Sequence, residues 1–187
     1  MVSVVCHNAL NRAVREFNLT DPGLILDKTR ELVIETFEKS DHEVKDGMDI
    51  ALCVLENNKL QYAGANNPLW IIRKDATEIE EIKANKQPIG KFDSLQPYTT
   101  HTLELQKGDI VYIFTDGYPD QFGGPKGKKY KYITLKNKLL EICHRSLEEQ
   151  HQILGREFDN WKAWPDLNGV RRELEQVDDV CIIGVRL

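Results

Sequence analysis

Two acidic segments, far apart in the sequence, could together bind a divalent cation. Asp116 directly follows an apolar, β-branched and aromatic run from Ile110 to Thr115. Asp178 and Asp179 come immediately before a second apolar run, Val180 to Val185. Carboxylates that are forced together repel one another unless a cation or a proton lies between them. If the two segments meet in the fold, a hard divalent cation is therefore the natural occupant.

Both apolar runs have the length and composition of buried strands. If the two strands are antiparallel neighbours, the end of the first lies beside the start of the second, and Asp116 and Asp178 converge at one edge of a sheet. A strand end is rigid and still reachable by water, which suits a metal ligand. The alternative is that Asp116-Gly117 is only a tight turn, because Asp-Gly commonly has that role after a strand.

The remaining metal-binding side chains are scattered, so the available ligands are oxygen atoms. The five histidines show no metal-binding spacing, and the four cysteines include no Cys-x-x-Cys pair. Carboxylates without His or Cys favour Mg²⁺ or Mn²⁺ over Zn²⁺. We interpret the cysteines as reduced core residues of a cytoplasmic protein; they are Cys6, Cys53, Cys143 and Cys181.

Length and charge restrict the class of protein. A chain of 187 residues suits one domain with a sizeable core. The net charge of −5 argues against nucleic acid or an anionic membrane as the main partner. No apolar run is long enough to span a bilayer, so we expect no membrane insertion of this segment.

The elements that must position the acids follow from periodicity and turn signals. Thr20 or Asp21, followed by Pro22, marks the start of the second predicted helix. The order of elements indicates an α+β fold in which helices pack outside antiparallel sheets. The predicted helices are 1–17, 24–37, 135–144 and 147–161; the predicted strands are 48–55, 60–64, 69–73, 78–82, 99–105, 110–115 and 180–185; and a polar loop is predicted at 40–46.

A glycine-rich basic loop at 123–131 follows the first acidic segment. Its lysines, from Lys126 to Lys131, are candidates for contact with a phosphorylated partner. The alternative is a run of charges that is simply solvated. The glycines do not match a phosphate-binding loop, because such a loop opens a helix after a strand.

Five short segments, taken together, resemble a known family. They are similar, in order along nearly the whole chain, to the bacterial serine phosphatases of the SpoIIE (sporulation stage II protein E) type. That family is a branch of the metal-dependent phosphatases related to protein phosphatase type 2C. The segments are Asp49-Ile-Ala-Leu, Ala63-Gly-Ala-Asn-Asn-Pro-Leu-Trp, Pro88-Ile-Gly, Gly108-Asp-Ile-Val-Tyr-Ile-Phe-Thr-Asp-Gly-Tyr-Pro-Asp-Gln-Phe-Gly-Gly and Gln176-Val-Asp-Asp-Val-Cys-Ile-Ile-Gly-Val.

The resemblance implies an αββα sandwich of antiparallel sheets with a site for two Mn²⁺ or Mg²⁺ ions. By motif position, it implies that Asp116 and Asp178 are metal ligands and catalytic residues. Asp179 is then a neighbouring residue of the metal site. Asp120 is a candidate ligand for an extra ion, or a contact behind the ligands.

Two further residues are implied to lie near the substrate. Gly117 would let the backbone turn close to the ion. Asn66 occupies the position at which relatives often carry His in an Ala-Gly-His-x-Pro turn, and it is a candidate for substrate binding.

One departure from the family concerns its first metal motif, an Asp-x-x-Gly-His-Gly segment on an early strand. This sequence does not contain the motif, and in relatives it directly precedes a helix like the one predicted at 1–17. We therefore expect residues 1–187 to form a single, partial phosphatase domain that lacks the first strands and binds metal weakly. Missing strands leave exposed sheet edges, which predicts a homodimer.

The function that the resemblance implies is hydrolysis of phosphoserine or phosphothreonine on a regulatory protein, such as an anti-sigma-factor antagonist. The domain would be the output of a bacterial signalling regulator. One alternative is a non-catalytic, pseudophosphatase-like module that binds a protein, and another is an unrelated α+β domain. Another class of phosphatase uses a strand-end Asp as nucleophile and needs an acid two residues later. This chain has Tyr118 at that position, so the sequence does not favour that class.

Overall fold

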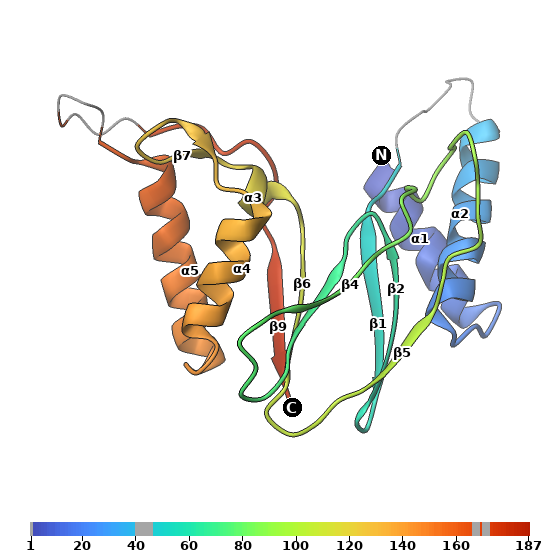
Figure 1. Cartoon of the computed structure of the whole chain (residues 1–187). Coiled ribbons are helices and arrows are strands. Elements are labelled where there is room, and N and C mark those ends of the chain that lie inside the picture. The colour runs from blue at the N-terminus through green and yellow to red at the C-terminus, as the bar shows by residue number, and fades with distance from the viewer. Residues whose placement is uncertain (1, 40–46, 166–168, 170–172) are drawn as a thin grey trace. The chain divides into compact units, whose positions relative to one another are not determined.

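Figure 1 shows the computed structural model, which describes residues 2–39, 47–165, 169 and 173–187. Its contacts divide the chain into two compact units. The first unit comprises Met1–Leu69 and Glu81–Gln106, and the second unit comprises Trp70–Glu80 and Lys107–Leu187. The polar loop predicted at 40–46 lies outside the described residues.

The first unit begins with two helices, α1 (Val2–Arg15) and α2 (Pro22–Glu38). Asp21 caps α2, because its side chain accepts a hydrogen bond from the backbone N–H of Leu24 at 3.0 Å. Pro22 occupies the first turn, where its missing N–H costs no hydrogen bond. The predicted start of this helix is confirmed. The buried core of the unit consists of Cys6, Ala9, Leu26, Leu32, Val33, Phe37, Ala63, Ala65, Ile89 and Tyr98.

Antiparallel strands complete the first unit: β1 (Ile50–Glu56), β2 (Lys59–Ala65) and β5 (His101–Glu104), in the order β1-β2-β5. Strands β1 and β2, which match the strands predicted at 48–55 and 60–64, form a hairpin in which Glu56 faces Lys59 across a two-residue turn. Asn57 in this turn has a φ of 54°. Asn tolerates the positive φ that tight hairpin turns require, so the sequence selects this turn.

A second antiparallel sheet gives the second unit its framework. Its strands, in spatial order, are β4 (Glu80–Ile82), β3 (Leu69–Ile72), β6 (Ile110–Phe114) and β9 (Ile182–Arg186). Strand β6 lies between β3 and β9 and is antiparallel to both. Ile110 faces Arg186, and Phe114 faces Ile182. The structure thus confirms that the two apolar runs beside the acidic segments are antiparallel neighbours.

Two longer helices, α4 (Tyr132–Ile142) and α5 (Leu147–Lys162), pack against this second sheet (Figure 1). Helix α5 begins with a capping box, in which Ser146 and Glu149 each bond the other's backbone N–H. The buried core of the unit consists of Trp70, Ile72, Ile110, Tyr112, Phe114, Tyr118, Tyr130, Leu135, Leu139, Ile142, Leu154 and Phe158. The predicted α+β class, with antiparallel sheets flanked by helices, is confirmed.

Two short elements differ from the sequence expectations. The chain does not make a tight turn after β6, because residues Gly117–Asp120 form the one-turn helix α3, in which the N–H of Asp120 donates to the carbonyl of Asp116 at 2.9 Å. The basic loop contains a small hairpin, β7 (Phe122–Gly123) with β8 (Lys128–Lys129). Both elements are too short for hydrophobic periodicity to reveal them.

The structure bears on two expectations from the sequence: that the cysteines are reduced core residues, and that no segment spans a membrane. All four cysteines are free. Cys181 is exposed, so its interpretation as a core residue is wrong; it lies just before the outer strand β9 of the sheet. Among the described residues, none of the helices has the length and apolar character needed to cross a membrane.

Candidate functional site

Asp116 lies at the end of β6, and its side chain is exposed. The pairing of β6 with β9 continues past the strand ends, because the N–H of Thr115 donates to the carbonyl of Cys181 at 3.0 Å. Asp116 therefore follows directly after a residue that is bonded to the segment carrying Asp178 and Asp179.

Thr115 fixes this segment through its side chain as well. Its hydroxyl donates to the carbonyl of Asp179 at 2.8 Å and accepts from the N–H of Cys181 at 2.9 Å. Our sequence interpretation treated Thr115 only as the last residue of a strand and missed this role. The available signal was a hydroxyl side chain at the end of an apolar run, directly before an acidic residue.

Gly117 shows how closely the two acidic segments approach. A Cβ atom on Gly117 would lie 2.5 Å from the carbonyl oxygen of Asp179 and 3.1 Å from that of Asp178. Its backbone thus packs directly on the backbone of Asp178-Asp179, and a side chain would not fit. We call the exposed group formed by Asp116, Asp178 and Asp179 the acidic edge.

The Asp178-Asp179 segment has a defined local conformation. One carboxylate oxygen of Asp178 accepts from the N–H of Asp179 at 2.7 Å, and the Gln176 side chain donates to the carbonyl of Asp178 at 2.9 Å. Both carboxylates are exposed to solvent. The acidic edge is therefore ordered and still open to an ion.

The carboxylate of Asp120 has a side-chain partner in the structure. Its carboxylate forms an ion pair with the ammonium group of Lys129 at 2.8 Å. A lysine at this distance competes with a cation for the same oxygen, so this contact does not favour Asp120 as a ligand of an extra metal ion. It connects α3 to the β7–β8 hairpin.

Asn66 belongs to the first unit. Its φ is 58°, and its side-chain amide donates to a carboxylate oxygen of Asp49 at 2.8 Å. The backbone N–H of Asn66 donates to the carbonyl of Asn85 at 2.9 Å. These bonds hold Asn66 in the turn after β2, and its role in substrate binding stays a prediction.

The acidic edge supplies only part of a metal-binding ligand set. Mg²⁺ and Mn²⁺ take oxygen ligands, so the carboxylates of Asp116 and Asp178 are suitable in kind. Within residues 2–39, 47–165, 169 and 173–187, however, no group of three or more His, Cys, Asp or Glu side chains is arranged to hold an ion. The described residues therefore do not form a complete two-metal site by themselves.

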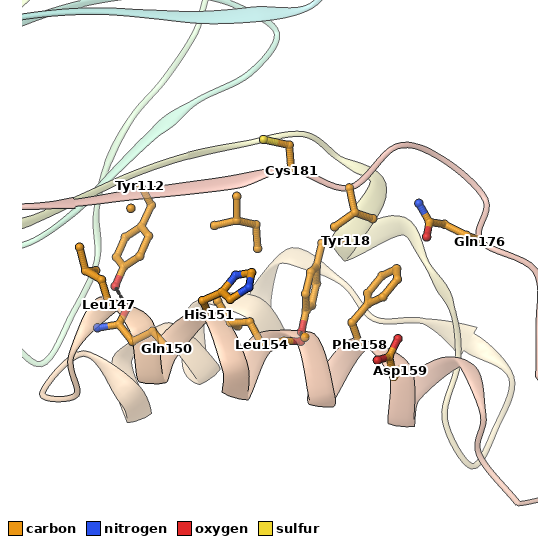
Figure 2. Close-up of a pocket in the computed structure, with 14 residues that line it drawn as sticks. Tyr112, Tyr118, Leu147, Gln150, His151, Leu154, Phe158, Asp159, Gln176 and Cys181 are labelled. Carbon is orange, nitrogen blue, oxygen red and sulfur yellow. Dashed lines mark hydrogen bonds between the residues drawn. The ribbon is translucent and has the colours of Figure 1, made fainter.

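A pocket of about 570 Å³ lies between α5 and the segment that leads into β9, and it is lined by residues on either side of Asp178-Asp179 in the chain, namely Gln176 and Val180. Figure 2 shows that His151 and Phe158 of α5 point toward the segment that carries Cys181. The Tyr112 hydroxyl donates to Gln150 at 2.6 Å, and burial raises the pKa of Tyr112 to about 12, so the phenol is neutral at physiological pH. The lining of the pocket is largely neutral, so the pocket suits an apolar group better than a phosphate.

Comparison with protein families gives a match over the whole chain. The family described as "Stage II sporulation protein E (SpoIIE)" matches residues 1–187. The chain belongs to the SpoIIE family. The resemblance inferred from the five sequence segments is therefore confirmed. A comparison with curated proteins gave no match.

Solved structures to which this SpoIIE-family chain is similar include phosphatase domains of the PP2C type. The SiaA-PP2C domain of Pseudomonas aeruginosa has a TM-score of 0.79 and 22% identity, over 100% of this chain and 68% of that one. The PP2C domain of SpoIIE from Bacillus subtilis, with a fragment of its regulatory domain, has a TM-score of 0.67 and 15% identity, over 99% and 49%. A phosphatase-domain structure of the same protein, presoaked with Mn, has a TM-score of 0.56 and 15% identity, over 97% and 73%. These matches confirm the predicted type 2C-like fold class.

Proposed function

We propose that this chain is a metal-dependent protein serine/threonine phosphatase domain that hydrolyses phosphoserine or phosphothreonine on a regulatory protein. The observation that supports the proposal is the packing of Gly117 on Asp178-Asp179, which brings the backbones of the two acidic segments together. The protein as encoded, including any residues that flank 1–187 (here called the full-length protein), is expected to release phosphate from a phosphoserine peptide when Mn²⁺ is present. No release above the metal-free rate would contradict the proposal.

The proposed roles of the residues follow from their places at the acidic edge. Asp116 and Asp178 are the candidate metal ligands, and Asp179 is a neighbouring acid of the same site. Thr115 acts as a positioning residue, because its hydroxyl bonds both the carbonyl of Asp179 and the N–H of Cys181. When Mn²⁺ or Mg²⁺ ions are bound, they lower the pKa of a water and offset the growing negative charge at phosphorus.

The cofactor and partner proposals rest on similarity. The Bacillus subtilis SpoIIE phosphatase domain has been presoaked with Mn, which supports Mn²⁺ as a cofactor in this family. That SpoIIE protein is a cell fate determinant and has a regulatory domain. By analogy, we propose a phosphorylated regulatory protein in the cytoplasm as substrate, of the kind represented by anti-sigma-factor antagonists.

The partial ligand set predicts weak metal binding by residues 1–187 alone. Because the described residues hold no group of three or more metal-binding side chains, too little negative charge is present to retain two ions. Titration calorimetry with Mn²⁺ is expected to give a Kd of about 1 mM or weaker. Tight binding of two ions would show that the chain carries a complete site.

A non-catalytic protein-binding module is the second candidate function. The observation that favours it is again the absence, among the described residues, of a complete ligand group. The two functions differ in one readout, which is Mn²⁺-dependent phosphate release by the full-length protein. Phosphoprotein binding without any release would favour the module.

The outer edge of β9 supports the predicted homodimer. Strand β9 is last in the order β4-β3-β6-β9, so within the described residues its other edge has no strand partner. Backbone bonds of Cys181 and Leu187 point toward the β6 side. By alternation, the N–H and C=O groups of Ile182, Gly184 and Arg186 point away from β6, where another strand could pair with them.

The ends of β9 carry opposite charges, which suits antiparallel pairing with a second copy. In the register that pairs Ile182 with Ile182 of the second copy, Asp178 faces Arg186 of that copy. Light scattering at rising concentration is expected to give twice the chain mass of 21.6 kDa. Arg186→Glu should weaken the dimer strongly. Because the Arg186 guanidinium also donates to the carbonyls of Cys143 and Arg145, the matched control is Arg186→Leu, which breaks the same bonds without adding a negative charge and should weaken the dimer less. A monomer at every concentration would contradict the proposal.

A further inference from the structure

The β7–β8 hairpin carries a dense cluster of positive charge. We call residues 122–131 the lysine hairpin, because Lys126, Lys128, Lys129 and Lys131 all lie in it and are all exposed. The whole chain has a net charge of −5, so this positively charged cluster is opposite in sign to the net charge of the protein. A run of charges of this kind is commonly only a solvated surface. A binding role therefore needs structural support besides the exposure of the lysines.

The lysine hairpin is fixed against α5 by close packing. The N–H of Gly124 donates to the carbonyl of Trp161 at 2.9 Å, and the indole N–H of Trp161 donates to the carbonyl of Gln121 at 3.0 Å. A Cβ atom on Gly124 would lie 2.5 Å from the Trp161 ring, and one on Gly123 would overlap the Trp161 carbonyl. The lysines are therefore carried on a rigid frame.

The same frame is bonded to α3, which directly follows Asp116. The N–H of Lys131 donates to the carbonyl of Pro119 at 2.7 Å, and the N–H of Tyr130 donates to that of Gln121 at 2.9 Å. The ion pair between Lys129 and Asp120 adds a side-chain connection. The hairpin and the helix after Asp116 thus form one bonded piece.

Gln121 connects this piece to the second acidic segment. Its side chain is fully buried, donates to the carbonyl of Glu175 at 2.9 Å and accepts from the N–H of Val177 at 3.1 Å. Val177 directly precedes Asp178. The lysine hairpin and the acidic edge therefore belong to one hydrogen-bonded assembly with fixed spacing.

The charges of this assembly are arranged in two opposite groups. The acidic edge repels an acidic or phosphorylated peptide, whereas lysines beside it attract one. Lys129 is engaged by Asp120. In the part of the chain that the structure describes, Lys126, Lys128 and Lys131 have no carboxylate within ion-pair distance, so their charges are available to a partner.

We propose that the lysine hairpin binds an acidic segment next to the phosphorylated residue of the substrate protein, and so holds the phosphate near the acidic edge. This inference rests on the proposed phosphatase function. Lysine suits the role, because its ammonium group is a mobile point charge that accepts carboxylates in many geometries. The predicted partner is therefore a phosphoserine protein with Asp or Glu residues close to the phosphorylated position.

The test measures binding without turnover, in metal-free buffer. Fluorescence anisotropy compares a phosphoserine peptide flanked by Glu with the same peptide flanked by Gln. Lys126→Glu with Lys128→Glu is expected to weaken binding of the Glu-flanked peptide about tenfold at low salt. The Gln-flanked peptide should change much less. The matched control, Lys83→Glu with Lys107→Glu, changes the charge equally at exposed positions outside the hairpin.

The outcomes separate this inference from the proposed function. Equal losses in the hairpin and control variants, or no preference for Glu-flanked over Gln-flanked peptide, would overturn the inference even if the full-length protein is a phosphatase. Selective loss in the hairpin variant supports it. If that selectivity is seen and the full-length protein releases no phosphate, the hairpin assignment stands and the catalytic proposal fails.

Discussion

Replacing Asp116 by Asn is expected to lower Mn²⁺-dependent phosphate release by the full-length protein more than about 100-fold. The change keeps the size of the side chain and removes the negative charge at the end of β6. Loss of residues that merely support metal ligands costs about 10–100-fold, and loss of a ligand should cost more. Asp178→Asn is expected to have a comparable effect, because the backbone of Asp178-Asp179 packs on Gly117, the residue after Asp116. The measurement is the initial rate with a phosphoserine peptide.

Two further variants serve as controls for this prediction. Asp93→Asn makes the same chemical change at an exposed position of the first unit and should leave the rate unchanged. Asp120→Asn should lower the rate less than about tenfold, because Asp120 is paired with Lys129. An Asp116→Asn protein with the wild-type rate would remove the basis for the proposed function.

Gly117→Ala is expected to lower the same rate by more than about tenfold while the protein still folds. The added methyl group would lie 2.5 Å from the carbonyl oxygen of Asp179, which is backbone and has little room to shift. Overpacking of this kind costs about 1–3 kcal/mol. Relief of the clash must move Asp178-Asp179 away from Asp116. Urea denaturation measures the free energy of unfolding, and the phosphoserine-peptide assay measures the rate.

Gly155→Ala is the matched control. Gly155 lies within α5, and nothing lies within 4 Å of the position that its Cβ would occupy. An Ala in a helix interior is more favourable than Gly by about 0.5–1 kcal/mol, so this variant should be more stable and equally active. If Gly117→Ala behaves in the same way as Gly155→Ala, the close approach of the two acidic segments has no functional role.

Local sequence patterns predicted most of the fold correctly. The cap at Asp21 and the apolar runs of β6 and β9 each depend on interactions within a few residues, and so the sequence around them is sufficient. The same is true of the acidic residues beside the strands. Their residue types alone predict oxygen ligands, and hence Mn²⁺ or Mg²⁺ as the bound ion.

Contacts between distant residues were decided only by the tertiary structure. Thr115 bonds Asp179 across 64 residues, and Lys129 occupies the carboxylate of Asp120. Gln121 connects the lysine hairpin to the segment before Asp178. Periodicity and turn signals report the conformational preference of short segments. Which distant residue a side chain bonds depends instead on which surfaces pack together in the folded chain. The sequence by itself therefore determined the strands and their acids, and the tertiary structure decided that these acids form one edge with a lysine hairpin bonded to it.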